Sequence, residues 1–291
     1  MMVEKENIHV LPDGRKLGYA VYGDKDRFPV LFFHGIPGSR LQQHPDMSIL
    51  NRYPICIYAL DRPGIGLSTH VKKRTLLDWT GDVLHFAERF EKFAIIGVSG
   101  GGPYSLACAY RFPYRLKHVS VISGLASLSM PDMLNLLRPR LKAAFISAKY
   151  AGFAIRPLLN KAFDLFQTRT EWAFENLFTV LPEKDLELMK EPDLVEMFKN
   201  DVAEAFRQGS KGVLEELRTL MRPWKFDPSD IIIPVQIWHG ASDTMVPVAM
   251  AHSHIDRLKH GAAHIIEDGG HFMVMQHLEQ IFSLISKDSE N

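Results

Sequence analysis

The sequence predicts an α/β fold in which a mostly parallel sheet is flanked by helices, and three observations support this prediction. Short apolar runs alternate with amphipathic segments between Ile8 and Ile122. Several of these runs are apolar at consecutive positions, which is typical of strands buried on both faces of a parallel sheet. The alternation resumes after residue 230, so we expect 1–126 and 231–291 to form one core domain.

Seven segments of the core have the pattern of strands. They are 16–23, 29–35, 56–61, 92–98, 118–124, 234–240 and 263–268. Apolar residues at helical spacing predict helices between or after these strands. These helices are expected at 75–90, 104–112, 247–258 and 273–285.

The segment 127–230 has a different pattern of apolar residues, with helical periodicity and no convincing strand. One predicted helical face consists of Met133, Leu137, Leu141, Ala144, Phe145 and Ala148. Further helical patterns are punctuated by Pro182, Pro192, Gly209 and Pro223. We therefore expect an all-helical insert at 127–230 that packs on the sheet domain.

Composition and charge limit the classes of partner. The 291 residues carry 34 Lys and Arg against 34 Asp and Glu, and 46% of them are hydrophobic. Nucleic acid and anionic membranes normally require a clustered cationic excess, so we expect neither as a partner. A small-molecule substrate fits this globular composition better.

The beginning of the sequence, "MMVEKENIHV", lacks the basic end and apolar run of a signal peptide. No stretch of about 18 apolar residues is present. The sequence thus predicts a cytoplasmic protein, which we expect to be a monomer or a homodimer. Cys56 and Cys108 lie in a strand-like and a helix-like run, where small core thiols are expected rather than a disulfide.

The segment Gly97-Val98-Ser99-Gly100-Gly101 matches the pattern G-x-S-x-G, the nucleophile elbow. In that motif a sharp turn from strand to helix exposes a serine oxygen above the sheet. Here the pattern follows an apolar strand and precedes a helix, which is the context that the motif requires. A dinucleotide-binding loop would need glycine in place of Ser99, and a P-loop would need a lysine after the last glycine. A glycine-rich turn without chemistry is the remaining alternative.

A serine nucleophile needs a base, and the base needs an acid that orients it. In this sheet architecture the chain order is serine, acid, histidine, with both partners after later strands. Asp243 and His271 follow the strands 234–240 and 263–268, so they are the candidate acid and base. Asp268 is the second candidate for the acid.

A tetrahedral intermediate also needs two N–H donors for its oxyanion. The amide of Gly100 follows the nucleophile directly, and the loop "HGIPGS" after the second predicted strand provides Ile36 as the other candidate. His34, in the same loop, is expected to support the loop rather than to act as a base. His252 and His254 lie two residues apart on a helix, so they cannot jointly hold a metal, and we expect both at the surface.

Together these motifs resemble those of the α/β-hydrolase superfamily, in members with a serine nucleophile and a helical cap domain. The segments "HGIPGS", "DRPGIGLS", "GVSGGG", "HGASDTMVP" and "GGHF" occur in that family's order and span nearly the whole chain. The resemblance implies a central eight-stranded sheet and an active site between the sheet and a cap. It also implies a structural role for the segment 61–68.

Relatives that open epoxides or remove halogens carry aspartate at the elbow, so Ser99 argues against both activities. Proline iminopeptidase relatives usually carry a tryptophan shortly after the serine, which "SGGGPY" lacks. Aminopeptidase activity is therefore not favoured.

The sequence thus predicts a serine hydrolase that cleaves a carboxylic ester, thioester or lactone with an apolar portion and needs no cofactor or metal. Two alternatives remain open, namely other reactions of the same triad, such as carbon–carbon bond hydrolysis or perhydrolysis, and a ligand receptor on a hydrolase scaffold. Aromatic and methionine side chains of the insert are candidates for an apolar wall of the site, or for the insert's own core. They are Met130, Met133, Phe145, Phe153, Phe163, Phe166, Trp172, Phe174 and Phe178.

Overall fold

The computed structural model describes residues 2–169, 172 and 181–290. Its eight strands form one sheet in the order β1-β2-β4-β3-β5-β6-β7-β8. The strands are β1 (Val3–Val10), β2 (Lys16–Tyr22), β3 (Phe28–Phe33), β4 (Ile55–Leu60), β5 (Phe93–Val98), β6 (Leu116–Ile122), β7 (Val235–Gly240) and β8 (Gly261–Ile266). The predicted α/β class is therefore confirmed, with each predicted strand within a few residues of its expected place.

Strand β1 is the element that the apolar pattern does not predict. It pairs antiparallel with β2, which pairs antiparallel with β4, and the remaining strands are parallel. As an edge strand, β1 buries little, and its apolar residues Ile8 and Val10 are about half exposed. Burial therefore leaves no strong pattern in its sequence.

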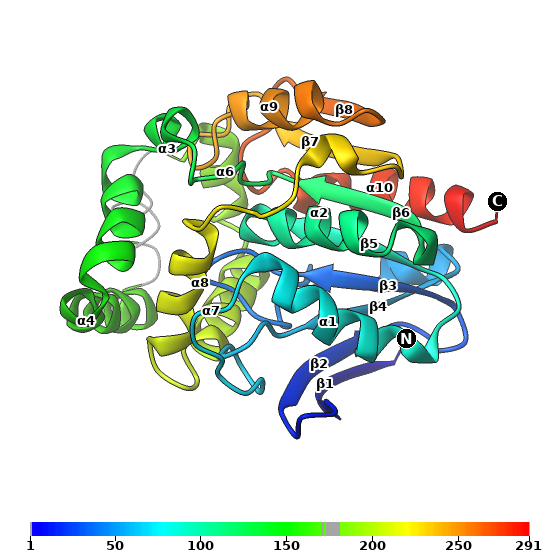
Figure 1. The fold of residues 1–291 in the computed structure, drawn as a ribbon, viewed down its shortest axis with the longest axis horizontal. Coiled ribbons are helices and arrows are strands. Elements are labelled where there is room, and N and C mark those ends of the chain that lie inside the picture. The colour runs from blue at the N-terminus through cyan, green and yellow to red at the C-terminus, as the bar shows by residue number, and fades with distance from the viewer. Residues whose placement is uncertain (1, 170–171, 173–180, 291) are drawn as a thin grey trace.

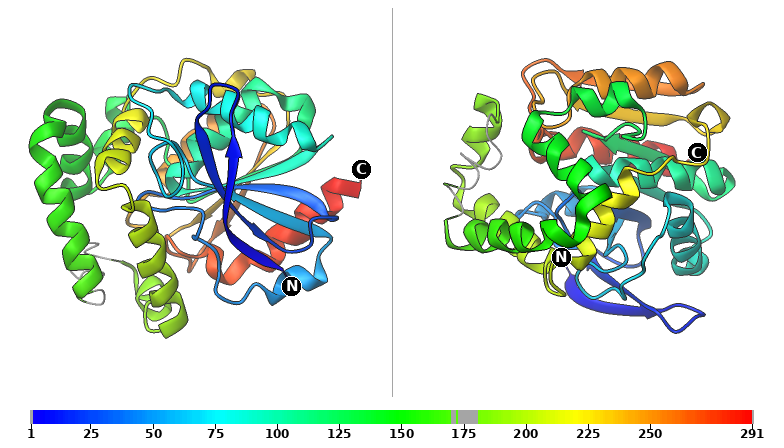
Figure 2. Two further views of the ribbon diagram at one scale, coloured as in Figure 1. Left: turned by 90° about the horizontal axis from the view of Figure 1, so that it is seen from below. Right: turned by 60° about the vertical axis from the view of Figure 1, so that its left-hand side comes forward.

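The parallel strands are buried on both faces, as their continuous apolar runs require. In β3, Leu31 and Phe33 belong to the core on one face, whereas Val30 and Phe32 belong to the core on the other. The first face is covered by α1 (Leu76–Phe86), α2 (Gly102–Arg111) and α9 (Ala249–Arg257), and the second by α10 (Val274–Glu290). Figure 2 shows α10 on the opposite side of the sheet from α1 and α2.

Between β6 and β7 the chain forms a group of helices at one end of the sheet, toward which the parallel strands point (Figure 1). We call the segment 127–230 the insert. The described helices of the insert are α3 (Pro131–Leu136), α4 (Pro139–Thr168), α6 (Glu183–Leu188), α7 (Pro192–Ala205) and α8 (Lys211–Leu220).

The single helical face expected from Met133 to Ala148 is divided between two helices. Leu137 and Arg138 are extended, and α4 begins at Pro139. A proline disfavours helical backbone at the residue before it, which favours a break between the two helices at Arg138. Helix α4 also bends at Ala151, whose φ of −127° and ψ of 30° are not helical.

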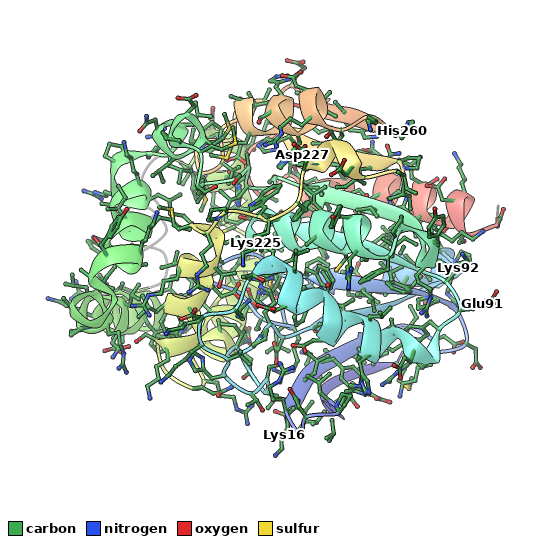
Figure 3. The ribbon with its side chains drawn as sticks, in the orientation of Figure 1. Lys16, Glu91, Lys92, Lys225, Asp227 and His260 are labelled. Atoms are coloured by element: carbon green, nitrogen blue, oxygen red, sulfur yellow. The ribbon has the colours of Figure 1, made fainter. Side chains whose placement is uncertain are left out.

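The insert shares its core with the sheet domain. Leu214, Leu217 and Leu220 of α8 and Phe145 of α4 are buried in the same cluster as the face covered by α1 and α2. Charged and polar side chains such as Lys16, Glu91 and His260 lie at the periphery (Figure 3). None of the described helices combines the length and apolar character needed to cross a membrane.

Candidate active site

Ser99 lies at the junction of β5 and α2, on a short 3-10 turn that spans Ser99–Gly101. Its φ of 53° is in the left-handed region, which residues other than glycine rarely adopt. This angle marks a strained turn. The neighbouring backbones approach closely, since a Cβ added at Gly101 would lie 2.8 Å from the carbonyl oxygen of His34. Only glycine fits at this position, and the tight turn holds Ser99 at the carboxyl end of the sheet.

His271 and Asp243 lie on loops that follow β8 and β7, and they are hydrogen-bonded to each other. The Nδ1–H of His271 donates to Asp243 Oδ2 at 2.7 Å. Asp243 Oδ1 accepts from the backbone N–H groups of Met245 and Val246, at 2.9 and 2.8 Å. Because Nδ1 carries the proton in this bond, Nε2 of the neutral ring is free to accept one.

Burial and charge act in opposite directions on both members of this pair. Burial disfavours the imidazolium form of His271, but the carboxylate of Asp243, and more weakly that of Asp185, hold its pKa above the ordinary value. Burial also disfavours ionisation of Asp243, but His271 and His239 hold its pKa below the ordinary value. The pair is therefore arranged to stabilise a protonated histidine beside an ionised aspartate.

Ile36 and Gly100 lie next to each other. A Cβ added at Gly100 would lie 2.9 Å from the Ile36 side chain, so this side chain packs directly on Gly100. The preceding amide, Gly35 N–H, donates to Gln42 Oε1 at 2.6 Å, whereas the Ile36 N–H donates to no described residue. Among the described residues, Gln42 therefore engages the Gly35 amide and leaves the Ile36 amide without an acceptor.

His34 supports this loop, as predicted from the sequence. Its ring is buried, with Nδ1 bonded to the Gly35 carbonyl oxygen at 2.8 Å and Nε2 accepting the Arg62 N–H at 3.3 Å. The Arg62 guanidinium donates to the carbonyl oxygens of His34 and Gly35 and pairs with buried Glu216 at 2.5 Å. Burial lowers the pKa of His34 far below the ordinary value, which keeps the ring neutral.

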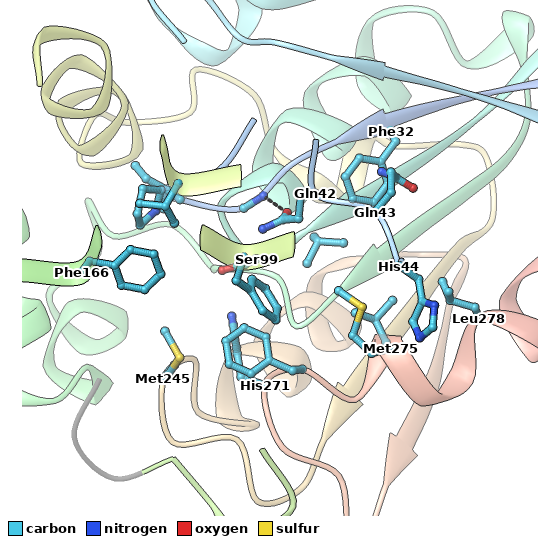
Figure 4. A pocket seen from close by; sticks show the side chains of 18 residues that line it. Phe32, Gln42, Gln43, His44, Ser99, Phe166, Met245, His271, Met275 and Leu278 are labelled. Atoms are coloured by element: carbon cyan, nitrogen blue, oxygen red, sulfur yellow. Dashed lines mark hydrogen bonds between the residues drawn. The ribbon is translucent and has the colours of Figure 1, made fainter. Parts of the chain in front are cut away.

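Two cavities meet at Ser99. The smaller, of about 70 Å³, is lined by both Ser99 and His271 (Figure 4). The larger, of about 620 Å³, extends from Ser99 between the loops and the insert. Its described lining is mainly apolar, with Arg138, Arg140, Thr244 and Ser99 as the polar members. A cavity of this size is typical of sites for small-molecule ligands.

The insert residues proposed for an apolar wall divide into several groups. Phe145, Phe163 and Phe166 line the larger cavity. Met133 packs against the main core, whereas Met130 and Trp172 are 37% and 43% exposed. Phe174 and Phe178 lie outside the described residues, as does the side chain of Phe153.

Comparisons with known proteins place the chain in a family. The sequence matches the α/β hydrolase fold family over residues 29–278. The chain belongs to this family. No curated protein sequence matches it significantly.

Solved structures of other α/β hydrolases resemble the chain over nearly its whole length. An esterase from Exiguobacterium antarcticum is 15% identical, with a TM-score of 0.67 and coverage of 98% of this chain and 99% of the esterase. An enol-lactonase from Burkholderia xenovorans is 15% identical, with a TM-score of 0.70 and coverage of 98% and 100%. A bromoperoxidase from Bacillus anthracis is 16% identical, with a TM-score of 0.73 and coverage of 95% and 96%. At this identity the likeness shows the fold.

Sequence reasoning missed several residues that contact the site of this α/β hydrolase. Asp185 and Asp201 of the insert are fully buried and accept hydrogen bonds from the loops that carry His271 and Ile36. The Nε2 atom of His239 is 3.4 Å from Asp243 Oδ2. The same nitrogen donates a hydrogen bond to the Val246 carbonyl oxygen at 2.7 Å. No local motif marks Asp185 and Asp201, because their partners are distant in sequence, whereas the partners of His239 lie only four and seven residues further along the chain.

The expectation that His252 and His254 are both at the surface is wrong for His254. Its side chain is buried, 3% exposed, and stacks on Trp224. Burial lowers the pKa of His254 to about 4, so its ring is neutral. Among the described residues, no group of three or more histidine, cysteine, aspartate or glutamate side chains is arranged to hold a metal ion.

A second set of serine, histidine and aspartate side chains lies together in this α/β hydrolase. His118 Nδ1 donates to Asp288 Oδ2 at 2.7 Å, and His118 Nε2 accepts from Ser120 Oγ at 2.7 Å. Ser120 is 0% exposed within β6, so a substrate cannot reach its hydroxyl. Ser120 is bonded to a histidine but is inaccessible, whereas Ser99 lines both cavities, so Ser120 is a useful control.

Proposed function

We propose that this α/β hydrolase cleaves a carboxylic ester, thioester or lactone through an acyl-enzyme intermediate. Ser99 is the nucleophile, His271 the general base and acid, and Asp243 the residue that orients His271. The backbone N–H groups of Ile36 and Gly100 form the oxyanion hole. Membership of the family supports hydrolase activity, and the neighbours described as esterase and enol-lactonase support an ester-type bond.

The reaction follows from these positions in two steps. Ser99 Oγ attacks the carbonyl carbon while its proton passes to His271 Nε2, and the two amides stabilise the resulting oxyanion. The C–O or C–S bond then breaks, and His271 returns the proton to the leaving alcohol or thiol. In the second step water attacks the acyl-enzyme as His271 takes its proton. Collapse releases the carboxylic acid and restores the Ser99 hydroxyl.

The observation that carries this proposal is the 2.7 Å bond between His271 and Asp243 beside a cavity that His271 shares with Ser99. The bond leaves Nε2 as the acceptor nitrogen, and Ser99, on its left-handed turn, lines both cavities. Among the described residues, no bond joins Ser99 Oγ to His271. Such contacts are often long without substrate and shorten when it binds.

The larger cavity supports a substrate with an apolar portion. It begins at Ser99 and continues along Phe145, Phe163 and Leu217. We further propose that the insert acts as a cap over the site, with 1–126 and 231–291 as the core domain. In this arrangement the apolar group of the substrate lies between the insert and the loops of the core.

Labelling with a fluorophosphonate, followed by intact-protein mass spectrometry, tests the nucleophile. We expect a single adduct on Ser99, no adduct with Ser99→Ala, and an unchanged adduct with Ser120→Ala. On a panel of esters of increasing acyl length, Ser99→Ala should lower kcat by roughly a thousandfold or more. Turnover retained by purified Ser99→Ala would refute the mechanism, and turnover of diketones or peroxide alone would favour the other triad reactions.

A further inference from the structure

The insert is bound to each of the three loops that carry Ile36, Asp243 and His271, and in each case through an ionisable side chain. Arg138 Nε donates to the carbonyl oxygen of Thr244, the residue after Asp243, at 3.2 Å. Asp201 Oδ1 accepts from both the N–H and the hydroxyl of Ser39, at 2.7 Å each, at the end of the loop that carries Ile36. The third side chain, Asp185, contacts the histidine loop.

Asp185 receives hydrogen bonds from the backbone of His271 itself. Its Oδ2 accepts the His271 N–H at 2.7 Å, and its Oδ1 accepts the Phe272 N–H at 3.0 Å. The Asp185 residue is 0% exposed, although it lies on the short helix α6 of the insert. A Cβ added at Gly270 would overlap the Asp185 carboxyl group, so the histidine loop packs directly on this carboxyl.

We propose that Asp185 is a positioning residue for His271, through which the insert sets the place and the basicity of the general base. The proposal rests on the proposed function, because it assigns Asp185 a role in the reaction of Ser99. Asp185 acts through the backbone and at a distance, since it contacts neither the substrate nor the His271 ring nitrogens.

Separate contacts hold the backbone and the ring of His271. The His271 N–H is held by Asp185, and the His271 carbonyl oxygen accepts from Ser123 Oγ at 3.1 Å. The ring is held separately by Asp243. The peptide groups on both sides of His271 and its imidazole are therefore fixed by three different segments. Because a misplacement of about 1 Å can cost about 100-fold in rate, loosening one of these contacts should reduce kcat.

The charges around His271 also act on its pKa. The described titratable groups around His271 are Asp243 and His239 from the loop and strand of β7, Asp185 from α6, and His44, which lines the same small cavity. The Asp243 carboxylate raises the pKa of His271, and the carboxylate of Asp185 adds to this effect. Burial raises the pKa of Asp185 itself, but two backbone donors favour its charged form.

Substitution of Asp185 by asparagine separates charge from shape. Asp185→Asn keeps the volume and one acceptor oxygen but removes the charge, so the pKa of His271 should fall. The acid limb of kcat/KM, which reports the free enzyme, should then move to lower pH. Asp185→Ala leaves two buried N–H groups without a partner, and we expect a larger loss of kcat, of roughly 10- to 100-fold, with a smaller change in KM. A variant that only perturbed the fold would change Tm without moving the pH profile.

The test combines kinetics with a measurement that needs no turnover. The pKa of His271 is determined by NMR titration of the ¹⁵N-labelled imidazole in wild type, Asp185→Asn and the control Asp193→Asn. Asp193 is an exposed aspartate at the start of α7, so its substitution removes the same charge from the insert. Circular dichroism and thermal unfolding monitor folding in each variant.

We expect a lower pKa of His271 in Asp185→Asn and an unchanged value in Asp193→Asn. An unchanged pKa in both variants, with kcat within twofold of wild type, would overturn the proposal. If wild type hydrolyses no ester and takes up no fluorophosphonate, the proposed function fails. The NMR titration still decides whether Asp185 controls the basicity of His271, so the two failures are distinguishable.

Discussion

Replacement of Asp243 by asparagine tests the orientation of His271 most directly. The two oxygens of Asp243 have different partners: Oδ1 accepts from the Met245 and Val246 amides, and Oδ2 accepts from His271 Nδ1. The asparagine oxygen is expected at the first position, because the opposite orientation would place an NH₂ group against two N–H donors. The asparagine NH₂ then faces His271 and donates to Nδ1.

The expected loss follows from these contacts. Two backbone hydrogen bonds at about 1 kcal/mol each disfavour the opposite amide orientation by about 2 kcal/mol, or roughly 30-fold. In the favoured orientation the histidine proton is on Nε2, which can no longer accept the proton of Ser99. Loss of the carboxylate charge beside the imidazolium costs about 1.5 to 2 kcal/mol more, or roughly 10- to 30-fold. We therefore expect kcat to fall by roughly 300- to 1000-fold.

The assay is steady-state hydrolysis of a 4-nitrophenyl ester by wild type, Asp243→Asn and Asp268→Asn. Asp268, the second candidate for the acid, is exposed and serves as the matched control. Asp268→Asn should keep kcat within a factor of two. A kcat for Asp243→Asn within tenfold of wild type, or a large loss in Asp268→Asn, would refute the assignment of the acid.

Three further predictions concern the surroundings of the site. Burial raises the pKa of Asp201 from 3.8 to about 8. The native state therefore binds a proton at this carboxyl more tightly than the unfolded chain does, and the ionisation of Asp201 lowers the free energy of unfolding as the pH rises from about 4 to about 8. Urea unfolding should therefore show that Asp201→Asn gains stability relative to wild type between pH 5 and pH 8; a parallel pH dependence would contradict this. Ala144→Phe places a ring in the larger cavity and should shift the preferred acyl length to shorter esters, whereas an unchanged preference would exclude this cavity as the acyl site. Gly101→Ala adds a methyl group 2.8 Å from the His34 carbonyl oxygen. This substitution should lower the free energy of unfolding, measured by urea denaturation, by about 2 kcal/mol. An unchanged free energy of unfolding would show that the turn can relax.

Much of the core could be predicted because its signals are local. The continuous apolar runs of β3 to β7 follow from burial on both faces, and the glycines around Ser99 follow from a turn in which neighbouring backbones nearly touch. The chain order of Ser99, Asp243 and His271 also follows from the family's topology. The structure places Asp243 and His271 within hydrogen-bond distance, and their roles in catalysis stay predictions.

The insert could be predicted only as a set of helices. The sequence does not indicate that Arg138, Asp185 and Asp201 contact the loops of the site, since a single charged residue in an amphipathic helix is most often solvated. His254 illustrates the same limit, because its burial against Trp224 depends on a residue 30 positions earlier in the chain, on a different segment. Long-range packing decides such cases, and it leaves no periodic trace in the sequence.

The sequence by itself determined the α/β architecture, the elbow at Ser99 and the positions of its candidate partners after later strands. These features depend on period, turn chemistry and chain order, which are properties of neighbouring residues. The tertiary structure alone decided the depth of the cavity, the different access of Ser99 and Ser120, and the contact of Asp185 with the His271 backbone. These features depend on the packing of segments that are distant in sequence, and such packing exists only in the folded chain.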